Sequence, residues 1–274
     1  MQEWKIAYVN QREIPVLISD EKEALLAAKA AGRAIVGLWR PGQAMDEISA
    51  AKYVVENPED VTEGYLERVA RRHLGLPWHI CETERVLIRE MYADDFDEIW
   101  ENQIGLGFGT VEELQAYTQN QYQFYGFGFW ALVDKESREL VGVAGLKVPE
   151  NADNAEMQGS HPKGHDSQID ILTLTVSDAD DSVNRKTETM TEQNLSAQFA
   201  HEPEEESEEE KATLELGYHI FPQFRRCGYA KEACQGILKY GAEELGVSRF
   251  MVRIEKENIV SRHLAESLGF LAGN

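Results

Sequence analysis

The sequence predicts an α/β protein, and three patterns along the chain support this fold class. Between residues 1 and 80, short apolar runs alternate with helix-forming runs, which is typical of a small parallel sheet. Residues 129–148 contain two apolar runs joined by a polar turn, which predicts an antiparallel hairpin. Residues 214–233 read as a strand, a basic turn with a glycine and the start of a helix. A length of 274 residues fits two domains, which we place at 1–80 and 81–274.

Composition and charge argue against several classes of protein. No stretch approaches the length of a membrane span, and the N-terminus has no signal-length apolar region, so neither secretion nor a membrane anchor is expected. The 3 cysteines lack the spacing of a disulfide framework or a zinc site, which favours a reducing, cytoplasmic compartment and no metal. The net charge of −22 opposes nucleic-acid binding, because phosphate backbones would be repelled.

Much of the negative charge lies in residues 150–211, which hold 17 Asp and Glu but 4 Lys and Arg. Large apolar residues are few there, so we expect most of this insertion to be mobile, apart from a β-like run at 169–176. An acidic arm that attracts a basic substrate is one interpretation. A solvated insertion, tolerated because long loops cost little more than short ones, is the interpretation that we favour.

In the first domain, one of the expected strands ends at Ser19-Asp20. A run of strong helix formers follows directly, and Gly32 ends this helix. This segment resembles the C-terminal part of a haloacid-dehalogenase-like domain, in which an aspartate at a strand end helps to hold magnesium. The nucleophilic aspartate motif of that family is missing here, and a phosphoaspartyl intermediate needs that nucleophile. We therefore interpret Asp20 as a helix cap and the domain as a docking or substrate-framing module.

In the second domain, the strand at 214–220 is followed by Phe221-Pro222, and proline cannot continue a sheet ladder. The helix that follows begins beside Arg225 and Arg226. A helix start offers unbonded N–H groups and the positive end of a dipole, so this turn predicts a phosphate site. A tight turn with its arginines in solvent is the alternative interpretation of the same residues.

The motif Arg225-x-x-Gly228-x-Ala230 resembles the pyrophosphate-binding signature of the GCN5-related N-acetyltransferases, the GNAT family. Asn258-x-x-Ser261 lies at the start of the last helix, where related enzymes have a similar pair. Further elements follow the order of the branch that contains ribosomal-protein N-terminal acetyltransferases: an opening strand at 84–89, a strand at 249–255 and a helix that ends at 268–270.

The resemblance implies a GNAT fold over residues 81–274, a mixed and mainly antiparallel sheet flanked by helices. It also implies acetyl-coenzyme A as co-substrate and direct transfer to an amine, either on a small molecule or at a protein N-terminus. Because Cys227 lies inside the expected pyrophosphate loop, we do not expect it to act as a nucleophile. The residues implied to bind the coenzyme are Ile220, Phe221, Arg225, Arg226, Cys227, Gly228, Tyr229, Ala230 and Asn258.

Two residues are implied to transfer protons. Glu215 is the only carboxylate on its strand and matches the glutamate that often acts as base in this family; an outward-facing surface charge is the alternative. Strand alternation places Glu215 on one face with Gly217 and His219. Ser261 is implied to protonate the leaving thiolate. Asn258 is implied to contact the pantetheine arm, and helix capping would use the same residue.

Two helices, a group of aromatic residues and the last strands of the family all bear on the acceptor side of the second domain. In the family, two helices border the acceptor side, and Thr110-x-x-Glu113 is a capping box for one of them. Aromatic residues are dense at 122–130, where they either line the acceptor site or fill the core. The family continues after its Gly-Phe motif with further strands, whereas this chain ends four residues after Phe270. Either the form is truncated, or another segment or subunit supplies the strand, with a homodimer left open. A non-catalytic acyl-coenzyme A-binding regulatory or interaction protein is the alternative function.

Overall fold

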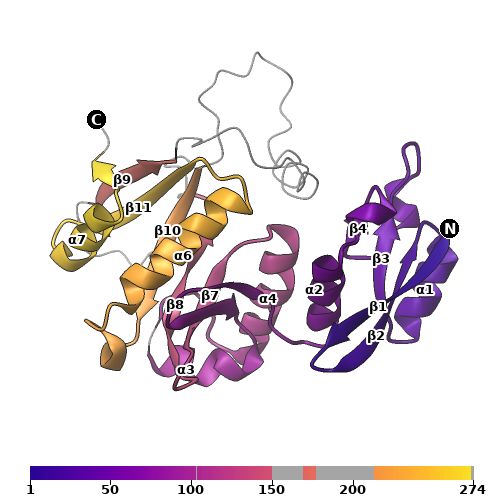
Figure 1. Ribbon diagram of the computed structural model, residues 1–274, viewed down its shortest axis with the longest axis horizontal. Helices are drawn as coiled ribbons and strands as arrows, with labels where there is room; N and C mark the ends of the chain where they lie inside the picture. Colours follow the sequence, from indigo (N-terminus) through magenta and orange to yellow (C-terminus); the bar gives the residue numbers. More distant parts are fainter. Residues whose placement is uncertain (103, 150–168, 177–212, 273–274) are drawn as a thin grey trace, which may run out of the picture.

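The computed structural model describes residues 1–102, 104–149, 169–176 and 213–272, and in these residues the chain forms two separate sheets (Figure 1). A four-stranded sheet lies near the N-terminus and an eight-stranded sheet contains the remaining strands. The second sheet begins with β5 (His79–Glu82), close to the boundary expected after residue 80. The division into two domains at that point stays a prediction.

The first sheet is built from β1 (Gln2–Val9), β2 (Arg12–Ser19), β3 (Ala34–Leu38) and β4 (Val54–Val55) in sequence order. The strands β2, β3 and β4 are parallel, as the strand and helix alternation predicts. The strand β1 was not predicted; it pairs antiparallel with β2 across a two-residue turn. Both turn residues, Asn10 and Gln11, have positive φ, the geometry that lets so short a turn match the twist of two strands.

Two helices cover opposite faces of the first sheet. Leu25 and Ala28 of α1 (Lys22–Ala30) pack against Leu17 on one face. Leu66 and Val69 of α2 (Glu63–His73) pack against the other face. Successive strand residues point to opposite sides of a sheet, so one apolar strand can supply both cores.

The second sheet is mixed and mainly antiparallel, as predicted. Its strands after β5 are β6 (Val86–Glu90), β7 (Phe129–Asp134), β8 (Leu140–Lys147), β9 (Ile169–Thr175), β10 (Thr213–Ile220), β11 (Arg249–Glu255) and β12 (Leu271–Ala272). They lie in the order β12-β9-β11-β10-β8-β7-β6-β5. All neighbours are antiparallel except the pair β10 and β11, which is parallel.

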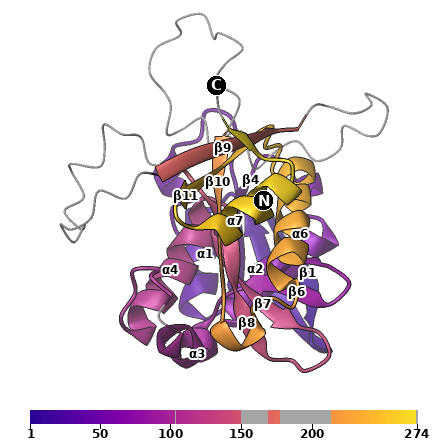
Figure 2. The ribbon, with the colours of Figure 1, turned by 90° about the vertical axis from the view of Figure 1, so that its left-hand side faces the viewer.

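Helices cover both faces of the second sheet, as Figure 2 shows. On one face, α6 (Tyr229–Glu243) and α7 (Ile259–Ser267) bury apolar residues in the larger core. On the other face lie α3 (Phe96–Glu101) and α4 (Val111–Phe124). The Thr110 hydroxyl accepts a hydrogen bond from the Glu113 amide at 3.3 Å, which confirms the predicted cap of α4. No helix of the described residues combines the length and the apolar character that crossing a bilayer requires.

The strand β9 comes from within the acidic insertion and becomes an integral part of the sheet. It pairs with β11 along its whole length, from Ile169 opposite Glu255 to Thr175 opposite Arg249. Leu172 is buried in the core, whereas Ile171 on the opposite face is exposed. The structure therefore has another segment of the chain beside β11, one of the options that the sequence left open. The rest of the insertion, and the expectation that it is mobile, lie outside the described residues.

Candidate functional site

The parallel strands β10 and β11 separate partway along their length. They pair only where Thr213–Glu215 faces Arg249–Met251, and in these fully described strands no pairing continues further. Beyond this point β10 keeps its pairing with β8, and β11 keeps its pairing with β9. Alternate peptide groups of residues 216–220 therefore face a gap between two neighbouring strands rather than a partner. Such a gap can receive an extended, amide-containing ligand as a substitute strand.

A strained loop closes the far end of this gap. After β10, the chain makes a turn at Pro222–Phe224 and enters α6 through Arg226 and Gly228, which have φ of 62° and 89°. The left-handed conformation is ordinary for glycine but costly for arginine, so the loop holds an unfavourable backbone geometry at Arg226. No side chain of the described residues caps α6. The first amides of this helix are therefore available to an anion.

The predicted coenzyme residues divide into supports and exposed groups. Ile220 is buried in the core under α6, and Phe221 is buried in the core under α3 and α4. The Phe221 amide donates to the Val141 carbonyl at 3.0 Å. The Arg225 Nε donates to the Ile220 carbonyl at 2.9 Å, which ties the loop to the end of β10. Arg225 and Arg226 are both exposed, and the Arg226 guanidinium, unlike that of Arg225, donates no hydrogen bond to another described residue. The roles predicted for these residues stay predictions.

The loop is braced by Arg85, which lies in the turn between β5 and β6 and whose role the sequence did not reveal. The Arg85 guanidinium donates to the Cys227 carbonyl at 3.0 Å, pairs with Glu232 of α6 and lies 4.9 Å from the centre of the Tyr229 ring. Thr83 also donates to Glu232, at 2.7 Å. Burial opposes ionisation of Glu232, but these hydrogen bonds lower its pKa. The carboxylate near the helix start is thus neutralised by Arg85.

Glu215 lies at the point where β10 and β11 separate. Its side chain is buried, and its two oxygens lie 3.5 Å from Lys147 Nζ and 3.4 Å from Arg253 Nε. The alternative of an outward-facing surface charge is therefore wrong. The predicted alternation of side chains along β10 between the two faces of the sheet is confirmed. Leu216 belongs to the core under α6. On the opposite face, an added Cβ at Gly217 would meet the Phe129 ring at 2.7 Å.

Asn258 and Ser261 meet at the start of α7, as their spacing predicts. The Asn258 side chain accepts a hydrogen bond from the Ser261 amide at 3.1 Å, so the capping interpretation is confirmed. Beside them lies the Tyr218 hydroxyl, which is shielded from solvent and has no partner of good hydrogen-bond geometry among the described residues. Burial raises the pKa of Tyr218, and the nearby Ser261 partly opposes this effect. Tyr218 lies in the strand that the sequence predicts at 214–220, and no role was assigned to it there. A phenol on that strand is the sequence feature that could have indicated a proton donor.

His219 is a second titratable group on the face of Glu215. Its Nε2 lies 3.5 Å from Arg225 Nη2. Burial first, and then the charge of Arg225, lower the pKa of His219 below the ordinary 6.5. The imidazole is therefore neutral at pH 7 and can accept a proton. Strand alternation had already placed this residue beside Glu215, although no role was assigned to it.

Three of the six aromatic residues at 122–130 fill the core. Tyr122, Phe127 and Trp130 are all at most 2% exposed. The Tyr122 hydroxyl donates to the Phe129 carbonyl and accepts from the Met91 amide at 3.1 Å, which fixes the entry to β7. Phe129 is only partly buried and covers Gly217 on the face of Glu215. Of these four residues, Phe129 is the one that borders the candidate site.

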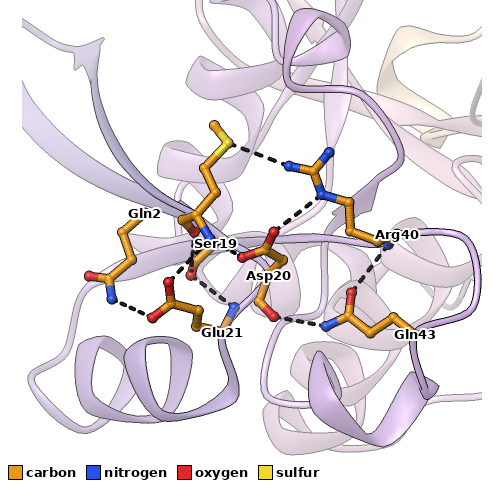
Figure 3. A network of polar contacts seen from close by, with 7 residues as sticks. Gln2, Ser19, Asp20, Glu21, Arg40 and Gln43 are labelled. Atoms are coloured by element: carbon orange, nitrogen blue, oxygen red, sulfur yellow. Dashed lines mark hydrogen bonds and ion pairs between the residues drawn. The ribbon is translucent and has the colours of Figure 1, made fainter.

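Asp20 does not cap the first helix, so that prediction is wrong. The carboxylate of Asp20 instead faces Arg40, as Figure 3 shows. The Arg40 Nε lies 3.2 Å from one Asp20 oxygen, and the Met1 amino group donates to the other. Burial opposes ionisation of Asp20, but these hydrogen bonds lower its pKa. Ser19 accepts from the Glu21 amide at 3.0 Å and forms the local turn. Within the described residues, no three His, Cys, Asp or Glu side chains cluster as metal ligands.

The C-terminal part of the chain is similar in sequence to known acetyltransferases. Residues 176–271 match the family model of the acetyltransferase (GNAT) domain. The uncharacterized N-acetyltransferase YnaD of Bacillus subtilis (strain 168) is 37% identical over 57 residues, which span 21% of this chain and 34% of that protein. Among solved structures, a GNAT-family acetyltransferase from Bacillus anthracis is 19% identical, with a TM-score of 0.40 over 69% of this chain and 81% of its own. The ribosomal L7/L12 α-N-protein acetyltransferase RimL is 11% identical, with a TM-score of 0.38 over 70% of this chain and 80% of its own.

Proposed function

We propose that this chain, which carries a GNAT acetyltransferase domain in its C-terminal part, is an acetyl-coenzyme A-dependent N-acetyltransferase that acts on a primary amine. The observation that carries the proposal is the separation of β10 and β11 above an uncapped helix start. The acceptor class is a small-molecule amine or a protein N-terminus. The 3 cysteines are free thiols, which supports a cytoplasmic location.

The loop and the gap would hold the two ends of the co-substrate. The unbonded amides at the start of α6 and the exposed Arg226 suit a pyrophosphate, since backbone N–H groups and a guanidinium are its usual partners. The peptide groups of β10 that face the gap suit the amides of a pantetheine arm. Arg85 acts as a positioning residue because it holds the Cys227 carbonyl away from the anion.

An amine nucleophile must lose its proton, and the face of β10 opposite α6 supplies the candidate bases. Glu215 stays our predicted base, acting through water. Because Lys147 and Arg253 flank its carboxylate, we add His219, which is neutral at pH 7, as a second candidate. An α-amino group, with an ordinary pKa of about 7.7–8.0, needs less help from either than a lysine does. Phe129 beside Gly217 would form part of the acceptor wall.

The departing thiolate needs a proton, and Tyr218 with Ser261 is the proposed source. A Tyr218→Phe variant is expected to lower kcat about 100-fold while the Kd for coenzyme A stays unchanged. The raised pKa keeps the phenol protonated, so it can act as a donor at neutral pH. Tyr240→Phe, which removes a largely buried hydroxyl from α6, is the matched control and should leave kcat unchanged. An unaltered kcat in Tyr218→Phe would leave Ser261 as the proton donor.

The pH profile identifies the base. A pKa below 6.5 means that His219 stays neutral, and competent, until the pH falls below that value. We therefore expect kcat/KM to decline on the acidic side below pH 6.5, and a His219→Gln variant to lack this decline. If His219→Gln retains the same acidic limb, Glu215 remains the only candidate of the two, and Glu215→Gln should then remove the limb.

Release of free thiol from acetyl-coenzyme A tests the proposed function. The full chain is mixed with acetyl-coenzyme A and a panel that contains peptides with free N-termini, polyamines and amino sugars. Thiol release that requires both the chain and one amine supports the proposal, and mass spectrometry should show the acetylated amine. Saturable coenzyme binding without any acetylated product would instead favour the acyl-coenzyme A-binding regulatory protein. Absence of binding would overturn both.

A further inference from the structure

A cleft of about 450 Å³ lies between the N-terminal sheet and the helix α4. One wall comes from α1, β3 and α2, and the other from the end of β6 and from α4. The volume is in the range of pockets that hold small molecules. Among the described residues, none that lines the cleft belongs to the loop that precedes α6, so the cleft is separate from the candidate acetyl-transfer site.

The wall on the N-terminal side is strongly cationic. Lys29, Arg33 and Lys52 line it. Arg33 and Lys52 are exposed, and neither forms an ion pair with any described residue. The Lys29 ammonium donates to the Ala50 carbonyl at 3.0 Å, which uses one of its three protons. This wall therefore presents donors that no carboxylate of the described residues neutralises.

The described residues bring little negative charge to the cleft. Glu90 is the single carboxylate among the described residues that line it. Both Glu90 oxygens accept hydrogen bonds from the Arg72 guanidinium, and one also accepts from the Trp78 amide at 3.1 Å. In a chain with a net charge of −22, a positive cleft is the local exception, and it would concentrate anions against the field of the rest of the chain.

The opposite wall is polar and uncharged. Gln115, Gln119 and Gln123 recur every four residues on α4 and line the cleft, together with Thr118. Residues four apart lie on the same side of a helix, so these amides form one stripe. Amides and hydroxyls can donate to phosphate or sugar oxygens without repelling them. The two walls together suit a compact ligand with a charged end and a hydroxylated or amide-binding end.

We propose that this cleft binds a small phosphorylated molecule with at least two negative charges. The cationic wall supplies the charge complement, the stripe of glutamines supplies neutral donors, and the volume limits the ligand to metabolite size. A nucleic acid is disfavoured because the chain as a whole is acidic. This proposal does not depend on acetyl transfer, since it uses different residues and a different part of the fold.

Calorimetric titration of the full chain with inorganic pyrophosphate at low ionic strength tests the proposal. Saturable binding is expected, and Arg33→Glu or Lys52→Glu should weaken it at least about 10-fold, because each replaces an attractive charge by a repulsive one. Arg12→Glu is the matched control: Arg12 is exposed at the start of β2, does not line the cleft and should leave the affinity unchanged. Added salt should weaken binding to the unmodified chain.

Pyrophosphate can also occupy the loop before α6, so Gly228→Glu serves as a second comparison. Retained binding in Gly228→Glu, together with loss in Arg33→Glu, assigns the ligand to the cleft. Loss in Gly228→Glu with retention in Arg33→Glu would overturn the proposal, because the loop would then be the phosphate site. Equal weakening by Arg33→Glu and Arg12→Glu, or no binding up to about 10 mM pyrophosphate, would also overturn it.

Discussion

An Arg72→Ala variant is expected to lose about 3–5 kcal/mol of unfolding free energy, the largest stability effect of a single substitution that we predict. Arg72 of α2 and Glu90 of β6 form a hydrogen-bonded ion pair, with Arg72 Nε 2.9 Å from one Glu90 oxygen. The Glu90 side chain is 4% exposed and that of Arg72 is 15% exposed. Removing the guanidinium would leave a carboxylate without its counter-charge, shielded from water. This pair also joins the N-terminal sheet to the second sheet, so its loss should loosen their contact.

Urea unfolding monitored by circular dichroism measures this effect. The matched control is Lys22→Ala, which breaks the exposed ion pair with Asp46 and should cost at most about 1 kcal/mol. The double variant Arg72→Met/Glu90→Met removes both buried charges at once, so it should recover most of the loss. If Arg72→Ala unfolds like the control, the buried charge of Glu90 does not stabilise this contact. If the double variant is as unstable as the single one, packing rather than charge is responsible.

The part of the site that the sequence predicted well is encoded locally. The strand, the basic turn and the start of α6 follow one another within 20 residues, and a glycine with positive φ is the residue that this turn requires. Capping of α4 by Thr110 and of α7 by Asn258 depends on contacts three residues away. Interactions over such short distances along the chain can be inferred from residue type and spacing alone.

The features that the sequence did not reveal depend on distant partners. Arg85 and Glu232 are 147 residues apart, and nothing in the surroundings of either residue indicates the other. The strand β9 has an alternating pattern, but its position beside β11 is a matter of topology. The sequence predicted a β-like run at 169–176 within the acidic insertion, but not its partner strand. The contact of Asp20 also depends on a distant partner. Its carboxylate binds Arg40, which follows β3, rather than the start of the helix directly after it.

The Gly228→Glu variant is expected to lose at least about 100-fold in affinity for coenzyme A, the largest functional effect that we predict. Gly228 has φ of 89°, and an added Cβ would lie 3.1 Å from Arg85 Nη2, so a larger residue disturbs the guanidinium that braces the loop. The new carboxylate would also place a negative charge beside the amides that are proposed to hold the pyrophosphate. Calorimetric titration with coenzyme A measures the change.

The control for this variant must carry the same strain and the same charge elsewhere. Gly32→Glu meets both conditions, because Gly32 has φ of 65°, lies in the turn between α1 and β3 and has open space around its Cβ position. A left-handed residue other than glycine costs about 1–2 kcal/mol in either place, so both variants should lose similar stability. Only Gly228→Glu should lose coenzyme binding. Equal affinity in the two variants would mean that coenzyme A does not bind at the start of α6, and the proposed acetyltransferase site would have to be abandoned.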